Sequence, residues 1–278
     1  MGNKKTVIIF IFLWLLLPFL LILAFQEEGA LSLYKEESAE SYLPFLVAYS
    51  LKGDMHMETV KAQTVILRSN LQNQIGSGEI SIDQINEKYG YFQEGKYYEW
   101  RDRYDVAEDA CKETEGEVLT YKNKVCYCPF FYNSSGITRD AFSFFEESSY
   151  PYLISVPSYQ DEECSTYLSY YYFTPEDFGL TAETFSMEIL ESDNAGYVLW
   201  VKVGNEVLGG EVFREKYGLS SSCFSLEQQE NQIRITCKGS GHGFGFSQYG
   251  ANVMAEEGKT YKELLHYYFP ETTLEKGV

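Results

Sequence analysis

The chain has 278 residues, a length that allows one large domain or two small ones with a sizeable buried core. Without Lys4 and Lys5, 20 of its 22 basic residues remain against 41 acidic ones, a formal charge of −21. This charge excludes nucleic acids and anionic polymers as electrostatic partners, and it is typical of a solvated acidic surface.

The first predicted element is a membrane-spanning helix over residues 6–25. This run is apolar and uncharged over about 20 residues, enough to cross a bilayer core of about 30 Å. Two lysines precede it and two glutamates follow it, so the positive-inside rule places the N-terminus in the cytoplasm and residues 26–278 outside. A cleaved signal peptide is the alternative, but the run is long and the residues after it make a poor cleavage site. We therefore predict a cytoplasmic tail and uncleaved single-pass anchor over 1–25.

A polar, glutamate-rich stalk is predicted over 26–42, followed by one domain over 43–278. Residues 43–51 are apolar and fit a helix or a strand. Residues 54–71 have helical spacing, and Asp54 stands where a helix cap is expected. Residues 72–105 are polar and tyrosine-rich, without clear periodicity.

The middle of this domain is predicted to contain hairpins and short helices. Residues 116–128 alternate around a Lys-Asn-Lys turn, which predicts a hairpin, and 150–158 form an extended apolar run. A threonine, a proline and two acids over 174–177 begin a short helix. The runs 187–191 and 197–203 flank the turn sequence SDNAG and predict a second hairpin.

The last third continues the same pattern. Residues 210–219 predict a short helix closed by a glycine, and 224–236 predict a third hairpin. Ser247 is predicted to cap a helix over 248–257. A capping box, TYKE, begins a last helix that ends before Pro270. The fold class is therefore α+β, with β-hairpins and short helices in an extracytoplasmic domain behind one N-terminal transmembrane helix.

All six cysteines follow the apolar run, and an even number in an exported chain suggests disulfides. Cys223 and Cys237 flank the third hairpin and could face each other across its two strands. The other four cysteines could instead form a thiolate zinc site, although their C-x-C spacing is unusual for zinc. These four are Cys111, Cys126, Cys128 and Cys164. The overall prediction is no bound metal and no cofactor.

A glycine-rich stretch, GHGFGFSQYGA, occupies residues 241–251. Its spacing fits neither the dinucleotide-binding fingerprint nor a P-loop, which excludes nucleotides. Alternate glycines leave one face of a strand bare, so that a ligand or another backbone can come close. His242 and Gln248 would stand at the edges of that surface, where an imidazole and an amide can hydrogen-bond sugar hydroxyls and amides. The alternative is a glycine bulge that serves only packing.

This stretch, continued by MAEEGKTY at 254–261 and YYFP at 267–270, resembles the C-terminal signature of the stage II sporulation protein D family, which includes the amidase-enhancer proteins. Three further segments are similar to family motifs and follow in the same order: ETVKAQTVILRS at 58–69, YPYLISVPS at 150–158 and GEVFREKYGLSSS at 210–222. The resemblance implies an exported protein that acts on peptidoglycan glycan strands, with a wall amidase or a morphogenetic complex as a possible partner.

Active members of the family resemble lytic transglycosylases, in which one carboxyl group protonates the leaving glycosidic oxygen and then accepts the proton of the sugar's own 6-hydroxyl. The resemblance places this glutamate eleven residues before Lys61, where this chain has Ser50. A serine hydroxyl cannot serve as that acid. Asp54 is the candidate for a displaced acid, and its alternative role is the helix cap.

The resemblance also implies substrate-binding residues. They are Lys61, Gln63, Arg68, His242, Ser247, Gln248 and Tyr249. Lys61 and Arg68 share a helix face that could line a glycan groove, and paired structural contacts are the alternative. Residues 131–138 read FYNSSGIT where the family has a His-Ser-Ser-Ser-Gly-Gly-x-Thr loop, so a histidine-bearing zinc site known from some relatives cannot form locally.

Three interpretations of function remain open. The first is a membrane-anchored protein that binds glycan strands and is weak or inactive as a transglycosylase, because the acid position is Ser50. The second is an active lytic transglycosylase that uses a displaced acid such as Asp54. The third is an exported structural or adhesion domain without a glycan ligand.

Overall fold

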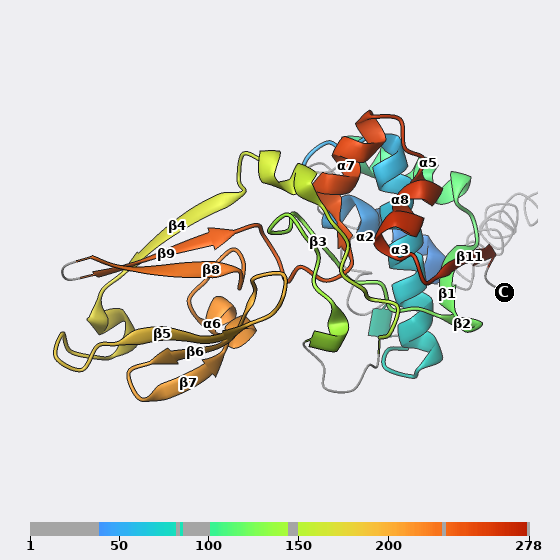
Figure 1. The fold of residues 1–278 in the computed structure, drawn as a ribbon. Coiled ribbons are helices and arrows are strands. Elements are labelled where there is room, and N and C mark those ends of the chain that lie inside the picture. Colours follow the sequence, from blue (N-terminus) through green and yellow to red (C-terminus); the bar gives the residue numbers. More distant parts are fainter. Residues whose placement is uncertain (1–38, 82–83, 86–100, 144–149, 230–231, 277–278) are drawn as a thin grey trace, which may run out of the picture. The chain divides into compact units, whose positions relative to one another are not determined.

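The computed structural model describes residues 39–81, 84–85, 101–143, 150–229 and 232–276 (Figure 1). The chain divides into two units, Met1–Ser41 and Tyr42–Val278. A short 3-10 helix, η1 (Ala39–Tyr42), lies at their boundary, and the other elements of the described residues belong to the second unit. The predicted anchor and most of the predicted stalk fall outside the described residues. None of the helices in the described part of the chain is both long and apolar enough to span a membrane.

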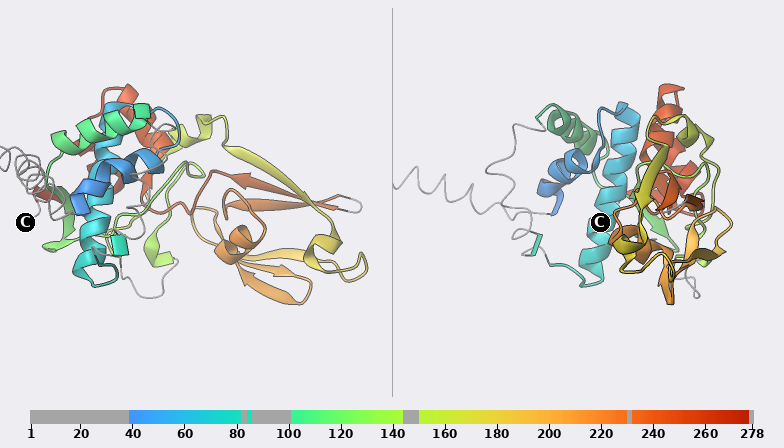
Figure 2. Two further views of the ribbon diagram at one scale, coloured as in Figure 1. Left: turned by 180° about the vertical axis from the view of Figure 1, so that it is seen from behind. Right: turned by 90° about the vertical axis from the view of Figure 1, so that its left-hand side faces the viewer.

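Helices from both ends of the second unit pack together, some of them around its first core. They are α2 (Leu43–Ser50), α3 (Met57–Gly76), α5 (Arg101–Glu113), α7 (Gln248–Glu256) and α8 (Tyr261–Tyr268). α2 and α5 pack against α3 and against each other, as both views in Figure 2 show. On the other side, Ile66 of α3 is buried in one cluster with Met254 of α7 and Leu264 of α8. The uncertain segment 43–51 is therefore a helix.

Two small sheets border this core. The first has the strand order β11-β1-β2 and is antiparallel, with β1 (Glu117–Tyr121), β2 (Lys124–Val125) and β11 (Thr273–Lys276). β1 and β2 are joined by Lys122 and Asn123, which both have positive φ, as a two-residue hairpin turn requires. The second sheet pairs β3 (Phe130–Phe131) in parallel with β10 (Phe246–Ser247).

Two antiparallel three-stranded sheets and one helix enclose a second core (Figure 1). One sheet has the order β4-β9-β8, with β4 (Leu168–Phe173), β8 (Phe224–Gln229) and β9 (Gln232–Lys238). The other has the order β5-β6-β7, with β5 (Met187–Ser192), β6 (Val198–Val203) and β7 (Glu206–Gly209). α6 (Gly210–Lys216) contributes Phe213, which packs with Val201 and Ile235. Short 3-10 helices complete the unit: η4 (Ala141–Ser143), η5 (Tyr159–Glu163) and η6 (Pro175–Phe178).

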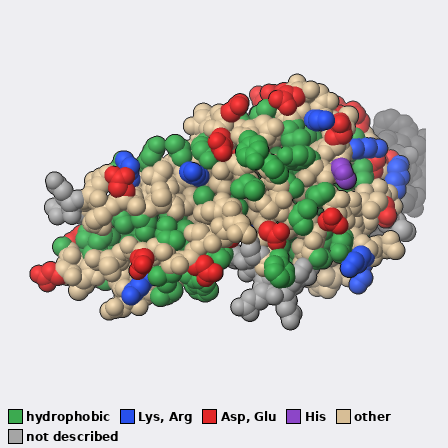
Figure 3. Space-filling model, in the orientation of Figure 1, with side chains coloured by type: hydrophobic (Ala, Val, Ile, Leu, Met, Phe, Trp, Pro, Cys, Tyr) green, Lys and Arg blue, Asp and Glu red, His purple; other side chains and the backbone are tan. Residues whose placement is uncertain are grey.

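The α+β class and the three predicted hairpins are confirmed. The predicted caps at Ser247 and Thr260 are also confirmed, because each side chain accepts a hydrogen bond from the first turn of its helix. The extended run at 150–158 forms no strand and pairs only through an isolated bridge between Pro157 and Ile137. Acidic side chains are scattered over the face in Figure 3, which agrees with a solvated acidic surface.

The predicted cap at Asp54 is wrong. α3 begins at Met57, and its cap is His56, whose Nδ1 accepts a hydrogen bond from the N–H of Glu58 at 3.3 Å. Asp54 stands two residues too early to reach the free N–H groups of the first turn.

The proposed cysteine pairings are not present, because all six thiols are free and buried. In the β8–β9 ladder Cys237 lies opposite Phe224, and both point into the second core. Cys223 is one residue before Phe224, so its side chain points to the other face of the sheet and cannot meet Cys237. Within the described residues, no group of three or more metal-binding side chains gathers, so the four-cysteine zinc site is not formed either.

Candidate functional site

The structure brings together three of the predicted site residues from three separate elements. Gln248, the first residue of α7, donates from Nε2 to the carbonyl oxygen of Ser50 at 3.0 Å and to Oε1 of Gln63 at 3.4 Å. Gln63 lies on α3 and Ser50 is the last residue of α2. Both glutamine side chains are buried, whereas Ser50 is half-buried and its hydroxyl donates to the carbonyl of Val47. The Gln248 amide therefore holds Ser50 in place at a surface that solvent reaches.

Aromatic rings and a lysine lie beside Ser50 on this surface. Lys52 extends over the ring of Tyr132, 4.8 Å from its centroid, and its amine donates to the hydroxyl of Ser240 at 3.3 Å. The ring of Tyr132 also meets that of Tyr249 edge-on, with centroids 6.2 Å apart. We call Ser50, Lys52, Tyr132 and Tyr249 the Ser50 surface. Sequence reasoning identified Ser50 and Tyr249 and missed Lys52 and Tyr132.

The loop that joins α2 to α3 borders this surface. It is held at one end by Lys52 and at the other by His56, whose N–H donates to Oδ1 of Asn252 at 2.7 Å. Asp54 lies between them, exposed to solvent and without a hydrogen bond or ion pair to any described residue. It is thus a carboxylate close in sequence to Ser50 that no neighbouring group positions.

The other nearby carboxyl group, Glu58, is unsuited to donate a proton. Burial alone would raise its pKa, but hydrogen bonds from Lys61 and from the N–H of Tyr261 outweigh this effect and lower the pKa. Glu58 is therefore ionised at neutral pH. Lys61 also pairs with Glu113 at 2.6 Å, which commits its charge to two carboxylates of the protein itself.

Arg68 also makes intramolecular contacts. It is buried, and it donates to the carbonyl oxygens of Thr114 at 2.7 Å, Glu117 at 3.2 Å and Cys111 at 3.3 Å. These carbonyls lie at the end of α5 and the start of β1, where a cation near a helix C-terminus is favourable. For Lys61 and Arg68 the structure therefore favours the structural alternative over contact with a ligand.

The glycines of the 241–251 stretch face other parts of the protein. Gly241 and Gly245 both have positive φ, at 116° and 77°. A Cβ on Gly241 would lie 2.6 Å from Cβ of Phe131, and one on Gly245 would overlap the carbonyl oxygen of Pro129. The bare side of this stretch is therefore filled by the neighbouring backbone and rings, so the packing bulge, not a ligand surface, explains its glycines.

His242 lies among aromatic rings and an ion-pair network. Its Nδ1 accepts a hydrogen bond from the N–H of Phe244 at 3.1 Å, and its ring meets that of Phe131 edge-on. Burial lowers its pKa to about 4, against a smaller opposing effect of Glu211. The imidazole is therefore neutral near pH 7 and can donate or accept a hydrogen bond but not supply a proton.

A buried aspartate that sequence reasoning missed positions the start of α7. Oδ2 of Asp161 accepts hydrogen bonds from the N–H and the hydroxyl of Ser134, at 2.8 and 2.6 Å. Its Oδ1 accepts from the hydroxyl of Ser247 at 2.7 Å, so the predicted ligand residue Ser247 is occupied by capping and by Asp161. Burial raises the pKa of Asp161 despite these bonds, but its side chain is enclosed and cannot reach a ligand. The sequence motifs identified Ser247 but gave no sign of its partner Asp161.

A second buried network was also missed. The guanidinium of Arg139 donates to Asp193 at 2.6 Å and to Glu211 at 2.8 Å, and Glu211 also pairs with Arg214. Arg139 further donates to the carbonyl oxygen of His242 at 3.2 Å. The network thus ties the glycine-rich stretch to the turn after β5 and to α6.

Comparisons with known proteins agree with the family that the motifs resemble. A family model described as Stage II sporulation protein matches residues 27–121. Over 260 residues the chain is 31% identical to stage II sporulation protein D of Bacillus subtilis (strain 168), covering 86% of this chain and 74% of that protein. The identity to stage II sporulation protein D of Bacillus amyloliquefaciens is also 31%, over 252 residues, 83% of this chain and 72% of the relative.

A shorter similarity joins the chain to a larger protein. Over 68 residues, 24% of this chain, it is 38% identical to the amidase enhancer of Bacillus subtilis (strain 168), of which this covers 9%. From the long matches, the chain belongs to the stage II sporulation protein D family. The family resemblance stated from the motifs is therefore confirmed.

Proposed function

We propose that the chain is a membrane-anchored protein that binds peptidoglycan glycan strands outside the cytoplasm and is weak or inactive as a transglycosylase. The observation that carries the proposal is the contact of Gln248 with the carbonyl oxygen of Ser50. It joins the start of the family's signature helix to the position that the resemblance assigns to the acid. A sugar bound over this contact would meet a hydroxyl group where cleavage needs a carboxyl group.

The Ser50 surface has the chemistry expected for a glycan. The faces of sugar rings are apolar and stack on aromatic side chains, and their hydroxyl and acetamido groups hydrogen-bond polar ones. Tyr132 and Tyr249 supply the rings, and Lys52 supplies hydrogen-bond donors next to Ser50. His242, neutral at physiological pH, could add a hydrogen bond only if the ligand extended toward it.

Weak or absent cleavage follows from the protonation states at the surface. The reaction needs one group that is protonated at neutral pH and then accepts a proton. The Ser50 hydroxyl does not lose its proton in this range, and Glu58 is ionised. The end of α2 would suit a carboxylic acid, since the negative end of a helix dipole disfavours the ionised form. The chain therefore keeps the helix end that would favour a protonated carboxyl group but has a serine there instead.

An active transglycosylase that uses Asp54 is the second candidate. Asp54 lies on the loop directly after Ser50 and Lys52 and has no other described role. A bound glycan strand could enclose Asp54, which is exposed to solvent in the unbound loop.

One digest separates these candidates. The full-length chain, purified in detergent, is incubated with purified peptidoglycan, and the soluble products are examined by mass spectrometry for 1,6-anhydro sugars. The proposal expects binding to the insoluble wall and no anhydro products. Ser50→Glu is expected to gain anhydro products, whereas the matched control Ser50→Gln, of nearly the same size but without an acid, is not.

Anhydro products from the unaltered chain that disappear in Asp54→Asn would replace the proposal by the second candidate. Failure of the chain to sediment with peptidoglycan would leave a structural or adhesion domain as the remaining interpretation. The location is tested separately, by the accessibility of 43–278 to protease added to intact spheroplasts. A wall amidase or a morphogenetic complex is the proposed class of protein partner.

A further inference from the structure

The outer face of the β4-β9-β8 sheet is polar and aromatic. On the central strand β9, Ile233, Ile235 and Cys237 point into the second core, so the residues between them point outward. The ladder places Tyr172 and Glu227 beside Arg234, Tyr170 and Ser225 beside Thr236, and Leu168 beside Lys238. Tyr170 and Tyr172 are about half exposed, at 53% and 55%.

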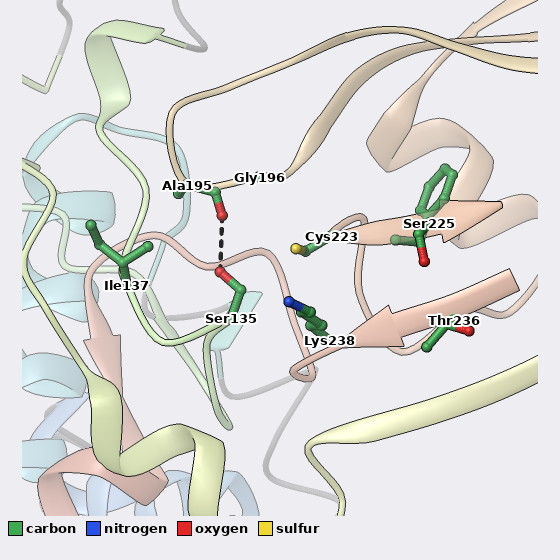
Figure 4. Close-up of a pocket in the computed structure, with 9 residues that line it drawn as sticks. Ser135, Ile137, Ala195, Gly196, Cys223, Ser225, Thr236 and Lys238 are labelled. Atoms are coloured by element: carbon green, nitrogen blue, oxygen red, sulfur yellow. Dashed lines mark hydrogen bonds between the residues drawn. The ribbon is translucent and has the colours of Figure 1, made fainter.

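A pocket of about 260 Å³ opens at the Lys238 end of this face. The sheet supplies Thr236, Lys238 and Ser225, and the loops supply Ser135, Ile137 and Ala195. Figure 4 shows the Lys238 amine and the Cys223 thiol ending on the side that faces Ser135. The Ser135 hydroxyl donates to the carbonyl oxygen of Ala195 at 3.0 Å, which ties the two loops together and fixes that wall.

The Lys238 side chain brings a positive charge to the pocket that the protein does not neutralise. Arg234, on the same face, is paired with Glu227, but no carboxylate of the described residues pairs with Lys238. The side-chain hydroxyls of Ser225 and Thr236 likewise make no hydrogen bond to another described residue. In a chain with a formal charge of −19, an unpaired lysine beside two available hydroxyls is a local positive patch on an acidic molecule.

The remaining walls limit the size and polarity of the anion. Ile137 and Ala195 present aliphatic groups. Such walls favour a methyl group beside the charged group, and one lysine suits a single charge better than a polyanion. Tyr170, next to Thr236 in the ladder, offers a ring on which the rest of the ligand can lie.

We propose that this pocket binds a methyl-bearing carboxylate, a CH(CH₃)–COO⁻ group, at a site separate from the Ser50 surface. Lys238, Ser225 and Thr236 bind the carboxylate, and Ile137 and Ala195 contact the methyl group. The proposal rests on the proposed function, since peptidoglycan carries this group both as the lactyl ether of N-acetylmuramic acid, where the peptide has been removed from it, and as the C-terminal alanine of its peptides. The lactyl ether and the C-terminal alanine share this group, and the test below distinguishes between them.

The test is ligand-observed saturation-transfer NMR on the full-length chain at low salt. The probes are N-acetylmuramic acid, the dipeptide D-Ala-D-Ala and, as a ligand without a carboxylate, an N-acetylglucosamine oligomer. At least one of the carboxylates is expected to bind with its methyl protons most strongly saturated, and the one that binds identifies the source. Lys238→Gln is expected to weaken this binding about tenfold or more, as is usual for a lost charged hydrogen bond.

The controls separate this site from the Ser50 surface. Lys202→Gln on β6 removes a lysine of the neighbouring sheet and should leave the binding of all three ligands unchanged. Thr236→Val should weaken only the binding of the carboxylate ligands. Lys238→Gln should not change the binding of the uncharged oligomer. Absence of carboxylate binding, or equal binding by Lys238→Gln, overturns the pocket proposal while leaving oligomer binding intact. If the unaltered chain bound neither the oligomer nor the wall, the proposed function would be overturned instead.

Discussion

Gln248 and Ser50 are 198 positions apart in the chain and are joined by a hydrogen bond of 3.0 Å. The bond connects a side chain at the first turn of α7 to the last carbonyl of α2, which would otherwise lack a partner as helix ends do. It is the link that makes one surface out of two distant segments.

Removal of this link is expected to reduce both stability and wall binding. Gln248→Ala leaves the Ser50 carbonyl and the buried Gln63 amide without this partner, which should cost about 1–3 kcal/mol. Urea unfolding measures the first effect, and sedimentation with peptidoglycan at a temperature where the variant is folded measures the second. Tyr249→Phe keeps the ring and serves as the control. Unchanged stability in Gln248→Ala would contradict the buried bond.

The buried pair of Arg139 and Asp193 should be among the most sensitive sites for stability. Both side chains are at most 1% exposed, so Asp193→Asn leaves a buried guanidinium with one charge partner fewer and is expected to cost about 3–5 kcal/mol. Lys112→Ala breaks a pair on the surface of α5 and should leave the unfolding midpoint unchanged. Equal midpoints for the two variants would show that the buried network does not stabilise the second core.

The glycine-rich stretch allows packing to be separated from backbone strain. Gly245 and Gly258 both have positive φ, but a Cβ at 245 would overlap the Pro129 carbonyl, whereas one at 258 would meet open space. Gly258→Ala should therefore cost only the strain, about 1–2 kcal/mol, and Gly245→Ala clearly more. Thermal unfolding of the two variants checks this order. Similar losses would mean that a Cβ at residue 245 does not clash with the Pro129 carbonyl.

His242 should make stability depend on pH in the mildly acidic range. Its pKa in the folded chain is about 4, below the value of 6.5 for an exposed histidine, so its contribution is complete above pH 6.5 and is lost as the pH falls toward 4. The loss is at most about 3 kcal/mol, reduced by the partial exposure of the ring. Asp161, whose pKa is raised, acts in the opposite direction, so the comparison is with His242→Gln. A variant with the same pH profile as the unaltered chain would argue against a buried neutral imidazole.

The state of the cysteines gives a direct chemical check. Six free thiols should all react with iodoacetamide after unfolding without reductant, adding six carbamidomethyl groups by mass. Burial raises the pKa of Cys223 and Cys128, so both should react slowly in the folded chain at neutral pH. Only four modified cysteines in the unfolded chain would instead reveal a disulfide.

Local sequence signals predicted most elements whose residues carry turns or caps. The capping box at Thr260 and the Lys-Asn-Lys turn each depend on a few adjacent residues and were correct. α5 was missed although Ala107, Ala110 and Cys111 are spaced for one buried helix face. β4 was missed because tyrosines point both into the core and outward, which hides the alternation of a strand.

The site was harder to predict than the elements. The family motifs led to Ser50, Gln63 and Gln248, which do meet, but the same motifs led to Arg68 and Ser247, which are occupied inside the protein. A motif shows that a residue is needed and does not say whether a ligand or the protein's own backbone needs it. Lys52 and Tyr132 carried no signal, because their proximity depends on the packing of distant segments.

The first core joins α3, near the beginning of the second unit, to α7 and α8 near its end. Ile66 and Leu264, packed in that core, would leave the ribosome roughly 10–40 s apart at typical rates of synthesis. The second core needs only neighbouring hairpins within residues 168–238 and can form in that interval. A growing chain therefore carries a folded sheet region while the apolar face of α3 is still uncovered. Because the last 30 residues cover this face, they decide whether the newly made protein aggregates.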